Sequence, residues 1–167
     1  MDRLFGGPGN DLIRTSEVSG GTHMNNDGDF ASGGSGNDRI LAADTGNFAE
    51  ILLGGPGHDY IHGYDGNDKL YGGDGDDELL VREGDNEIHG GNGDDVITVI
   101  ETSPVDDGNN DLHGDAGDDN ITGGYGRDDL YGGDGNDILF GAGGSDELWG
   151  EAGDDILKGG DRNDSIL

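Results

Sequence analysis

Aspartates recur in this chain at a fixed spacing that would bring pairs of carboxylates together, and paired carboxylates bind divalent cations. They occupy the sixth place of a nine-residue repeat, Gly-Gly-x-Gly-x-Asp-x-(Ile/Leu)-x. The aspartates at this place are Asp11, Asp38, Asp59, Asp68, Asp77, Asp95, Asp119, Asp128, Asp137, Asp146, Asp155 and Asp164. A short fixed period is typical of a solenoid, in which each repeat is one structural unit stacked on the next.

The other conserved places of the repeat predict the elements that position these carboxylates. Glycines at places one, two and four permit a tight turn with positive φ. The eighth place is always Ile or Leu and is the centre of a three-residue strand, so its side chain faces away from its two neighbours. The residues at this place are Ile13, Ile40, Leu52, Ile61, Leu70, Leu79, Ile88, Ile97, Leu112, Ile121, Leu130, Leu139, Leu148, Leu157 and Ile166.

Two repeats make one coil of turn, strand, turn and strand. The sequence therefore predicts an all-β fold, a right-handed parallel β-roll (a two-sheet β-solenoid) of about eight 18-residue coils, with the Ile/Leu ladder between the sheets. We expect residues 1–167 to form a single domain with one degenerate coil at 15–32. Insertions at 42–44 and 99–104 should bulge outward and leave the register intact.

The composition excludes several classes of protein. Hydrophobic residues make up 29% of the chain and the formal net charge is −30, values that favour disorder unless cations neutralise the carboxylates. The same charge repels nucleic acid and anionic membrane surfaces, so we expect neither as a partner. The absence of cysteine excludes disulfides and thiolate metal sites, and no apolar run is long enough to span a bilayer.

The stacked turns should need a hard cation. Aspartates of turns on the same side lie one coil apart, roughly 5 Å, where two carboxylates repel by about 3 kcal/mol at an effective dielectric constant of 20. Carboxylate and carbonyl oxygens, without His or Cys, select Ca²⁺ over transition metals, and Mg²⁺ resists losing its water ligands.

The repeat resembles the RTX (repeats-in-toxin) family of hemolysin-type calcium-binding nonapeptide repeats, at least over residues 33–167, where Gly57, Gly66 and Gly75 keep the fourth place. The resemblance implies that Ca²⁺ lies between consecutive turns of one side. Its ligands would be carbonyls at places two and four and the Asp of one turn, with carbonyls at places one and three and the Asp of the next. The carbonyl ligands implied are those of Gly34, Gly36, Gly54, Gly55, Pro56, Gly57, Gly72, Gly73, Asp74, Gly75, Gly90, Gly91, Asn92, Gly93, Gly114, Asp115, Ala116, Gly117, Gly124, Gly126, Gly132, Gly133, Asp134, Gly135, Gly141, Ala142, Gly143, Gly144, Gly150, Ala152, Gly159 and Asp161.

Alternate repeats fall on alternate sides, which predicts two unequal columns. One runs without a break through Asp38, Asp59, Asp77, Asp95, Asp119, Asp137 and Asp155 and makes six sites. The other contains Glu50, Asp68, Asn86, Asn110, Asp128, Asp146 and Asp164, with Arg162 in place of a turn glycine. We expect two good sites in it, Asp128/Asp146 and Asp146/Asp164, and therefore about eight Ca²⁺ ions in all. The turns of Asn86 and Asn110 are expected to be weak or empty, although an Asn carbonyl could still be a ligand.

Two outer surfaces carry further candidates. Tyr71, His89, His113, Tyr131 and Trp149 should form a column of rings, which either stacks on a glycan or packs as a cross-strand ladder. The apolar side chains Ile138, Phe140 and Ile156 should be exposed together, where a partner, a following domain or a dimer mate could cover them.

The sequence predicts no enzyme. His-Glu-x-x-His does not occur, the histidines lie on the surface or in turns, and any catalytic domain would lie outside this chain. The resemblance implies a calcium-binding structural module of a secreted, extracellular bacterial protein, exported by type I secretion and folding on Ca²⁺ outside the cell. The alternatives are a glycan-binding or adhesive module, and the non-catalytic repeat region of a secreted enzyme such as an alginate epimerase, protease or lipase.

Overall fold

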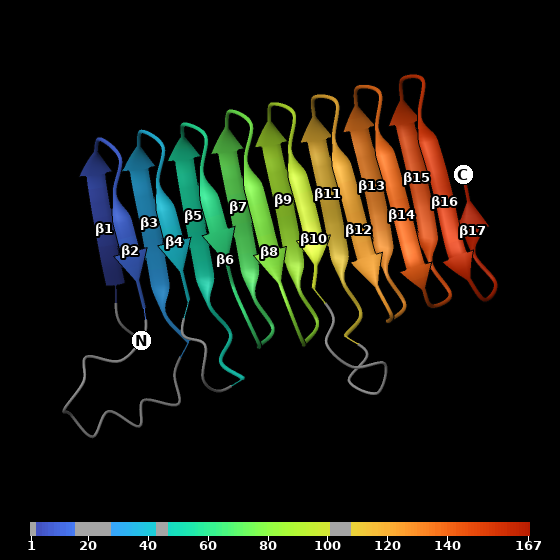
Figure 1. The fold of residues 1–167 in the computed structure, drawn as a ribbon, viewed down its shortest axis with the longest axis horizontal. Helices are drawn as coiled ribbons and strands as arrows, with labels where there is room; N and C mark the ends of the chain where they lie inside the picture. Colours follow the sequence, from blue (N-terminus) through green and yellow to red (C-terminus); the bar gives the residue numbers. More distant parts are fainter. Residues whose placement is uncertain (1–2, 16–27, 43–46, 101–107) are drawn as a thin grey trace.

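The chain winds back and forth between two facing parallel sheets along a rod (Figure 1). The computed structural model describes residues 3–15, 28–42, 47–100 and 108–167, and every regular element in these ranges is a β-strand. The nine-stranded sheet contains β1 (Arg3–Pro8), β3 (Phe30–Ser35), β5 (Ile51–Pro56), β7 (Lys69–Asp74), β9 (Glu87–Asn92), β11 (Asp111–Ala116), β13 (Asp129–Asp134), β15 (Glu147–Ala152) and β17 (Ser165–Ile166). The eight-stranded sheet contains β2 (Leu12–Arg14), β4 (Arg39–Leu41), β6 (Tyr60–His62), β8 (Glu78–Val81), β10 (Val96–Val99), β12 (Asn120–Gly124), β14 (Ile138–Gly143) and β16 (Ile156–Asp161).

Each strand, except those at the ends of the sheets, pairs in parallel with the strands one coil before and one coil after it. In the longer sheet, for example, Leu70 of β7 is aligned with Leu52 of β5 and with Ile88 of β9. The aliphatic of the eighth place is thus always opposite another aliphatic of the eighth place. The predicted all-β, two-sheet parallel solenoid with a repeat of about 18 residues is confirmed.

The strands of the longer sheet extend beyond the three residues that the repeat predicts. Strand β7 has six residues, and its ladder with β9 continues through Gly73 and Asp74, paired with Gly91 and Asn92. The extension is possible because successive turns have the same backbone conformation, so their peptide groups stay in hydrogen-bonding register after the strand proper has ended.

The core is one aliphatic side chain wide. Every eighth-place residue from Ile40 to Leu148 is fully buried between the sheets, as predicted. The degenerate coil contributes Ala31, also fully buried and aligned with Leu4 and Leu52, and β1 begins ahead of the first predicted repeat and continues into its turn. Ile166 was predicted to lie in the ladder but is exposed, because β17 is the last strand of its sheet and pairs only with β15.

The predicted irregular segments fall largely outside the described residues. Residues 16–27 of the degenerate coil, 43–46 around the first insertion and 101–107 around the second are not described. The second insertion begins inside a strand, because Val99 is the last residue of β10, is buried and pairs with Val81. The register continues across it, since Ile97 of β10 pairs with Ile121 of β12.

The outer face of the shorter sheet has an exposed apolar end. Ile138 of β14 pairs with Ile156 of β16, and both side chains are exposed, as is that of Phe140. This confirms the predicted apolar surface. In the described ranges, no helix has the length and apolar character needed to cross a membrane.

Neighbouring residues of β10 provide a test of the core. Ile97 is fully buried, whereas the adjacent Val96 faces outward and is exposed. Ile97→Ala should destabilise the fold by about 2–5 kcal/mol, because it removes packed aliphatic surface and leaves a cavity. Val96→Ala should change stability by less than about 1 kcal/mol. Urea unfolding followed by circular dichroism in one buffer measures both, and equal effects would contradict the single-residue core.

Candidate metal centre

Turns on one side of the rod align their sixth-place carboxylates in an unbroken column. The column consists of Asp11, Asp38, Asp59, Asp77, Asp95, Asp119, Asp137 and Asp155, so the predicted column is extended by one member, and the sixth-place Asp11 stands at its start. In each member from Asp38 to Asp155, Oδ1 accepts a hydrogen bond of 2.7–2.9 Å from the backbone N–H of the Asp one coil earlier. One carboxylate oxygen per turn is therefore used to attach that turn to the preceding one.

The second oxygen of these carboxylates lacks a hydrogen bond. Oδ2 of every column member from Asp11 to Asp137 is inaccessible to solvent and has no hydrogen-bond partner among the described residues. A buried charged oxygen without a partner is costly, and in native proteins such an oxygen is satisfied by a donor, a proton or a metal ion. Each turn thus offers a strong oxygen ligand that the protein itself does not satisfy.

The first-place glycines show where these oxygens point. A Cβ added to Gly54 would collide both with Oδ2 of Asp59 and with the carbonyl oxygen of Gly72 in the next turn. The same pair of collisions recurs in the turns that begin at Gly72, Gly90, Gly114 and Gly132. A carboxylate oxygen and a carbonyl oxygen of the following turn therefore face the same small space. This all-oxygen donor set fits Ca²⁺.

The carboxyl groups of the unbroken column have raised pKa values. The pKa of Asp77, Asp95 and Asp119 is raised to about 7, mainly by burial and also by neighbouring carboxylates, against the lowering effect of the backbone N–H bond. Burial also raises the pKa of Asp59 and Asp137. Without a cation, the turns hold their charged carboxylates only at a cost in free energy.

The opposite side carries the mixed column, which consists of Glu50, Asp68, Asn86, Asn110, Asp128, Asp146 and Asp164 and has the same backbone bonding, at 2.9–3.2 Å. The amide of Asn86 donates to the carbonyl of Gly84 and to Oδ1 of Asn110, while that of Asn110 donates to Oδ1 of Asp128. In these two turns an N–H donor replaces the second carboxylate oxygen, and it bonds to a neighbouring oxygen instead of offering a charged ligand.

Glu50, at the start of the mixed column, differs again. Burial and its side-chain hydrogen bond with Asp68 raise the pKa of Glu50 to about 9. Burial also raises the pKa of Asp68 and of Asp146. Both columns contain the residues that the sequence assigns to them.

The turn carbonyls that the family resemblance implies as ligands are stacked in register. Gly55 is aligned with Gly73 and Pro56 with Asp74 on the side of the unbroken column, and Ala142 is aligned with Gly160 on the other. Most third-place carbonyls accept a backbone hydrogen bond from the previous turn, as in Gly57 N–H to Asp74, at 2.7 Å. A carbonyl oxygen has two lone pairs, so this bond leaves one for an ion.

Sequence reasoning missed a second ladder beside the unbroken column. Fifth-place side chains accept hydrogen bonds from backbone N–H groups one coil away, as Asp76 does from Asp94 at 3.1 Å and Asp94 from Asp118 at 2.9 Å. Unlike the sixth-place carboxylates, these groups are exposed. The signal was present in the sequence, because Asn, Asp or His fills the fifth place throughout this side.

The predicted ring column is present on the outer face of the longer sheet. Tyr71, His89, His113, Tyr131 and Trp149 form one continuous stack, with successive centroids 4.4–5.4 Å apart and planes within 9° of parallel. Each inner ring is therefore covered on both faces by its neighbours, and only its edges reach solvent.

A model of the RTX calcium-binding nonapeptide repeat, which comprises four copies, matches residues 1–17, 25–44, 44–79, 71–98, 105–139 and 131–166. A sequence search of curated proteins finds no match. The matched repeats are non-catalytic and of a calcium-binding type, and they coincide with the stacked turns and strands described above. The chain therefore belongs to the RTX family of calcium-binding nonapeptide-repeat proteins.

Proposed function

We propose that this chain is a structural module of a secreted bacterial protein and that it folds when Ca²⁺ outside the cell fills its turns. The observation that carries the proposal is the column of buried carboxylates, each with one oxygen that no described residue satisfies. The family supports the setting, because RTX repeats are typical of secreted bacterial proteins.

The energetics of the turns favour coupling between calcium binding and folding. Stacking two carboxylates one coil apart costs about 3 kcal/mol at an effective dielectric constant of 20, and burial adds to this cost. The unfolded chain contains no preformed site, so the free energy of ion binding is also free energy of folding. Sites with Kd of about 10⁻⁴–10⁻³ M would be empty in the cytosol and filled outside. The chain would then leave the cell unfolded and fold on exit.

We further propose that about eight ions bind. Six lie between the seven carboxylates from Asp38 to Asp155, and two lie at Asp128/Asp146 and Asp146/Asp164. The amide hydrogen bonds of Asn86 and Asn110 support weak or absent binding in their turns. The ligands are the sixth-place carboxylates with the turn carbonyls stacked around them.

The ring column does not favour a glycan-binding function. A pyranose ring stacks on the face of an aromatic ring, and both faces of His89, His113 and Tyr131 are occupied by neighbouring rings. The column is better explained as cross-strand packing that stiffens the sheet. The module would then support a neighbouring domain through its rigidity.

Calcium titration tests the proposed function directly. In excess chelator at neutral pH we expect a disordered circular dichroism spectrum, and at millimolar Ca²⁺ a cooperative change to a β spectrum. Mg²⁺ should substitute poorly because it retains its water ligands. A β spectrum of full amplitude in chelator at neutral pH would overturn the proposal.

The proposed difference in calcium binding between the two columns can be tested with two residues of one coil. Asp119 and Asn110 lie nine residues apart on opposite sides. Asp119→Ala removes a carboxylate shared by two proposed sites and should raise the midpoint of calcium-induced folding several-fold. Asn110→Ala, the matched control, should shift the midpoint less than about twofold, since it removes only amide hydrogen bonds. Equal shifts would show that the two sides are assigned the wrong roles.

The raised pKa values also predict how the calcium-free protein responds to pH. Asp77, Asp95 and Asp119 have pKa values of about 7 in the folded state, against a usual value near 4. Between about pH 4 and about pH 7 the folded state therefore binds more protons than the unfolded state. Its stability is therefore greatest below about pH 4 and falls as the pH rises through about 7. In chelator we expect more β signal at about pH 5 than at about pH 8, and a spectrum that does not change over this range would contradict the assignment.

A further inference from the structure

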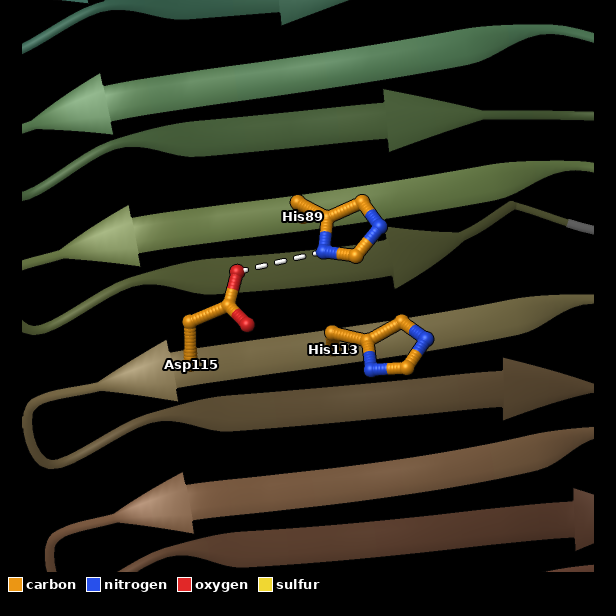
Figure 2. A group of neighbouring side chains, drawn as sticks. All are labelled: His89, His113 and Asp115. Atoms are coloured by element: carbon orange, nitrogen blue, oxygen red, sulfur yellow. Dashed lines mark hydrogen bonds and ion pairs between the residues drawn. The ribbon is translucent and has the colours of Figure 1, made fainter.

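Two histidines of the ring column lie beside an aspartate of the adjacent turn. His89 belongs to β9, and His113 and Asp115 belong to β11. One ligand atom of each residue lies within 4.8 Å of the others, and Nδ1 of His89 is 3.2 Å from Oδ2 of Asp115. Figure 2 shows the carboxylate of Asp115 beside the Nδ1 edges of both imidazole rings. This group lies on the outer face of the sheet and takes no part in the carboxylate columns.

The separation of these atoms is close to that required by a shared metal ion. A tetrahedral ion with ligand distances of about 2.0–2.1 Å holds neighbouring donor atoms about 3.3 Å apart. His89 and Asp115 already have this spacing. The two imidazoles are stacked 4.4 Å apart and within 9° of parallel, so their lone pairs point in the same direction. Binding requires one ring to turn toward its neighbour, which its partial exposure permits.

Carboxylates on the far edges of the rings favour this use of Nδ1. Nε2 of His113 is 2.9 Å from Oδ1 of Asp111, and Nε2 of His89 is 4.0 Å from Oε1 of Glu87. When Nε2–H of His113 donates to Asp111, the lone pair of the ring is on Nδ1, beside Asp115. Histidines that bind metals usually donate their second ring N–H to a carboxylate in this way.

Asp115 is a departure from the repeat at this place of the turn. The aligned residues in the adjacent strands are Gly91 and Gly133, both with positive φ, and Asp115 adopts φ 75°. Glycine takes up this conformation at no cost, whereas a side chain makes it less favourable. Glu151 lies two coils after Asp115 and also replaces a glycine of the repeat. It has φ 68° and pairs with Gly133.

We propose that His89, His113 and Asp115 form a surface site for one divalent transition metal ion of the Zn²⁺ or Cu²⁺ class. Two imidazole nitrogens and one carboxylate oxygen suit such an ion, whereas Ca²⁺ prefers the all-oxygen turns. Water would complete the coordination, since all three side chains reach solvent. The strongly negative protein raises the local concentration of any cation.

The chain itself supplies conservative variants for the test. Asp115→Gly restores the residue found in the two adjacent strands, removes the positive-φ side chain and leaves the backbone carbonyl in place. His89→Tyr and His113→Tyr introduce the ring found at Tyr71 and Tyr131, so a stack is retained while a ligand is lost. Glu151→Gly is the matched control, because it makes the same change two coils from Asp115.

The experiment is isothermal titration of the full chain with ZnCl₂ in saturating Ca²⁺, with circular dichroism to verify folding of each variant. We expect one equivalent of Zn²⁺ to bind to the original protein. Asp115→Gly, His89→Tyr and His113→Tyr should each weaken binding by at least about tenfold, and Glu151→Gly by less than about twofold. Unchanged affinity in the first three variants, an absence of binding in the original protein, or displacement of Zn²⁺ by additional Ca²⁺ would overturn the proposal.

Discussion

A buried carboxylate that uses only one of its oxygens within the protein is the feature on which this structure depends. In the unbroken column, Oδ1 accepts the backbone N–H of the preceding turn, and this bond sets the spacing of the coils. The same arrangement brings each carboxylate next to the following one and excludes water from Oδ2. The bond that stacks the turns thus also brings together the charges that oppose stacking.

The hydrophobic core is too small to offset the repulsion between the stacked carboxylates of the turns. Each strand from β4 to β15 contributes one fully buried Ile or Leu to the ladder, such as Leu70 or Ile97, and few other aliphatic side chains, among them Val81 and Val99, are buried between the two sheets. A globular domain surrounds its core with several layers of contacts, whereas a solenoid coil contacts only the coils next to it. Stability therefore has to be supplied in every turn, and a cation in each turn is a local solution that can be repeated along the rod.

The register that aligns carboxylates on the sides of the rod also aligns side chains on its outer faces. The five stacked rings from Tyr71 to Trp149 arise because one place of the repeat recurs at the same point in each coil. Because of this alignment, a single residue that departs from the repeat lies beside side chains of the neighbouring coils. Asp115 takes the place of a turn glycine and thereby brings a carboxylate to two neighbouring imidazoles.

The sequence by itself determined the repeat, and through the repeat the parallel sheets, the buried ladder and the two carboxylate columns. These features follow from local spacing: a glycine turn and an aliphatic every nine residues leave one way to stack, so Asp119 and Asn110 could be assigned to opposite sides. The family followed from the same motif, which is specific enough to be identified without coordinates.

Only the tertiary structure decided what depends on the orientation of atoms between coils. Spacing could not show that Oδ1 of each Asp is bonded while Oδ2 is not, or that the amides of Asn86 and Asn110 donate to their neighbours. It could not place Nδ1 of His89 beside Asp115, because those residues are 26 positions apart and meet only through the register of β9 and β11. The end of the stack likewise exposes Ile166, whose local sequence matches that of the buried residues, because burial requires a strand on each side.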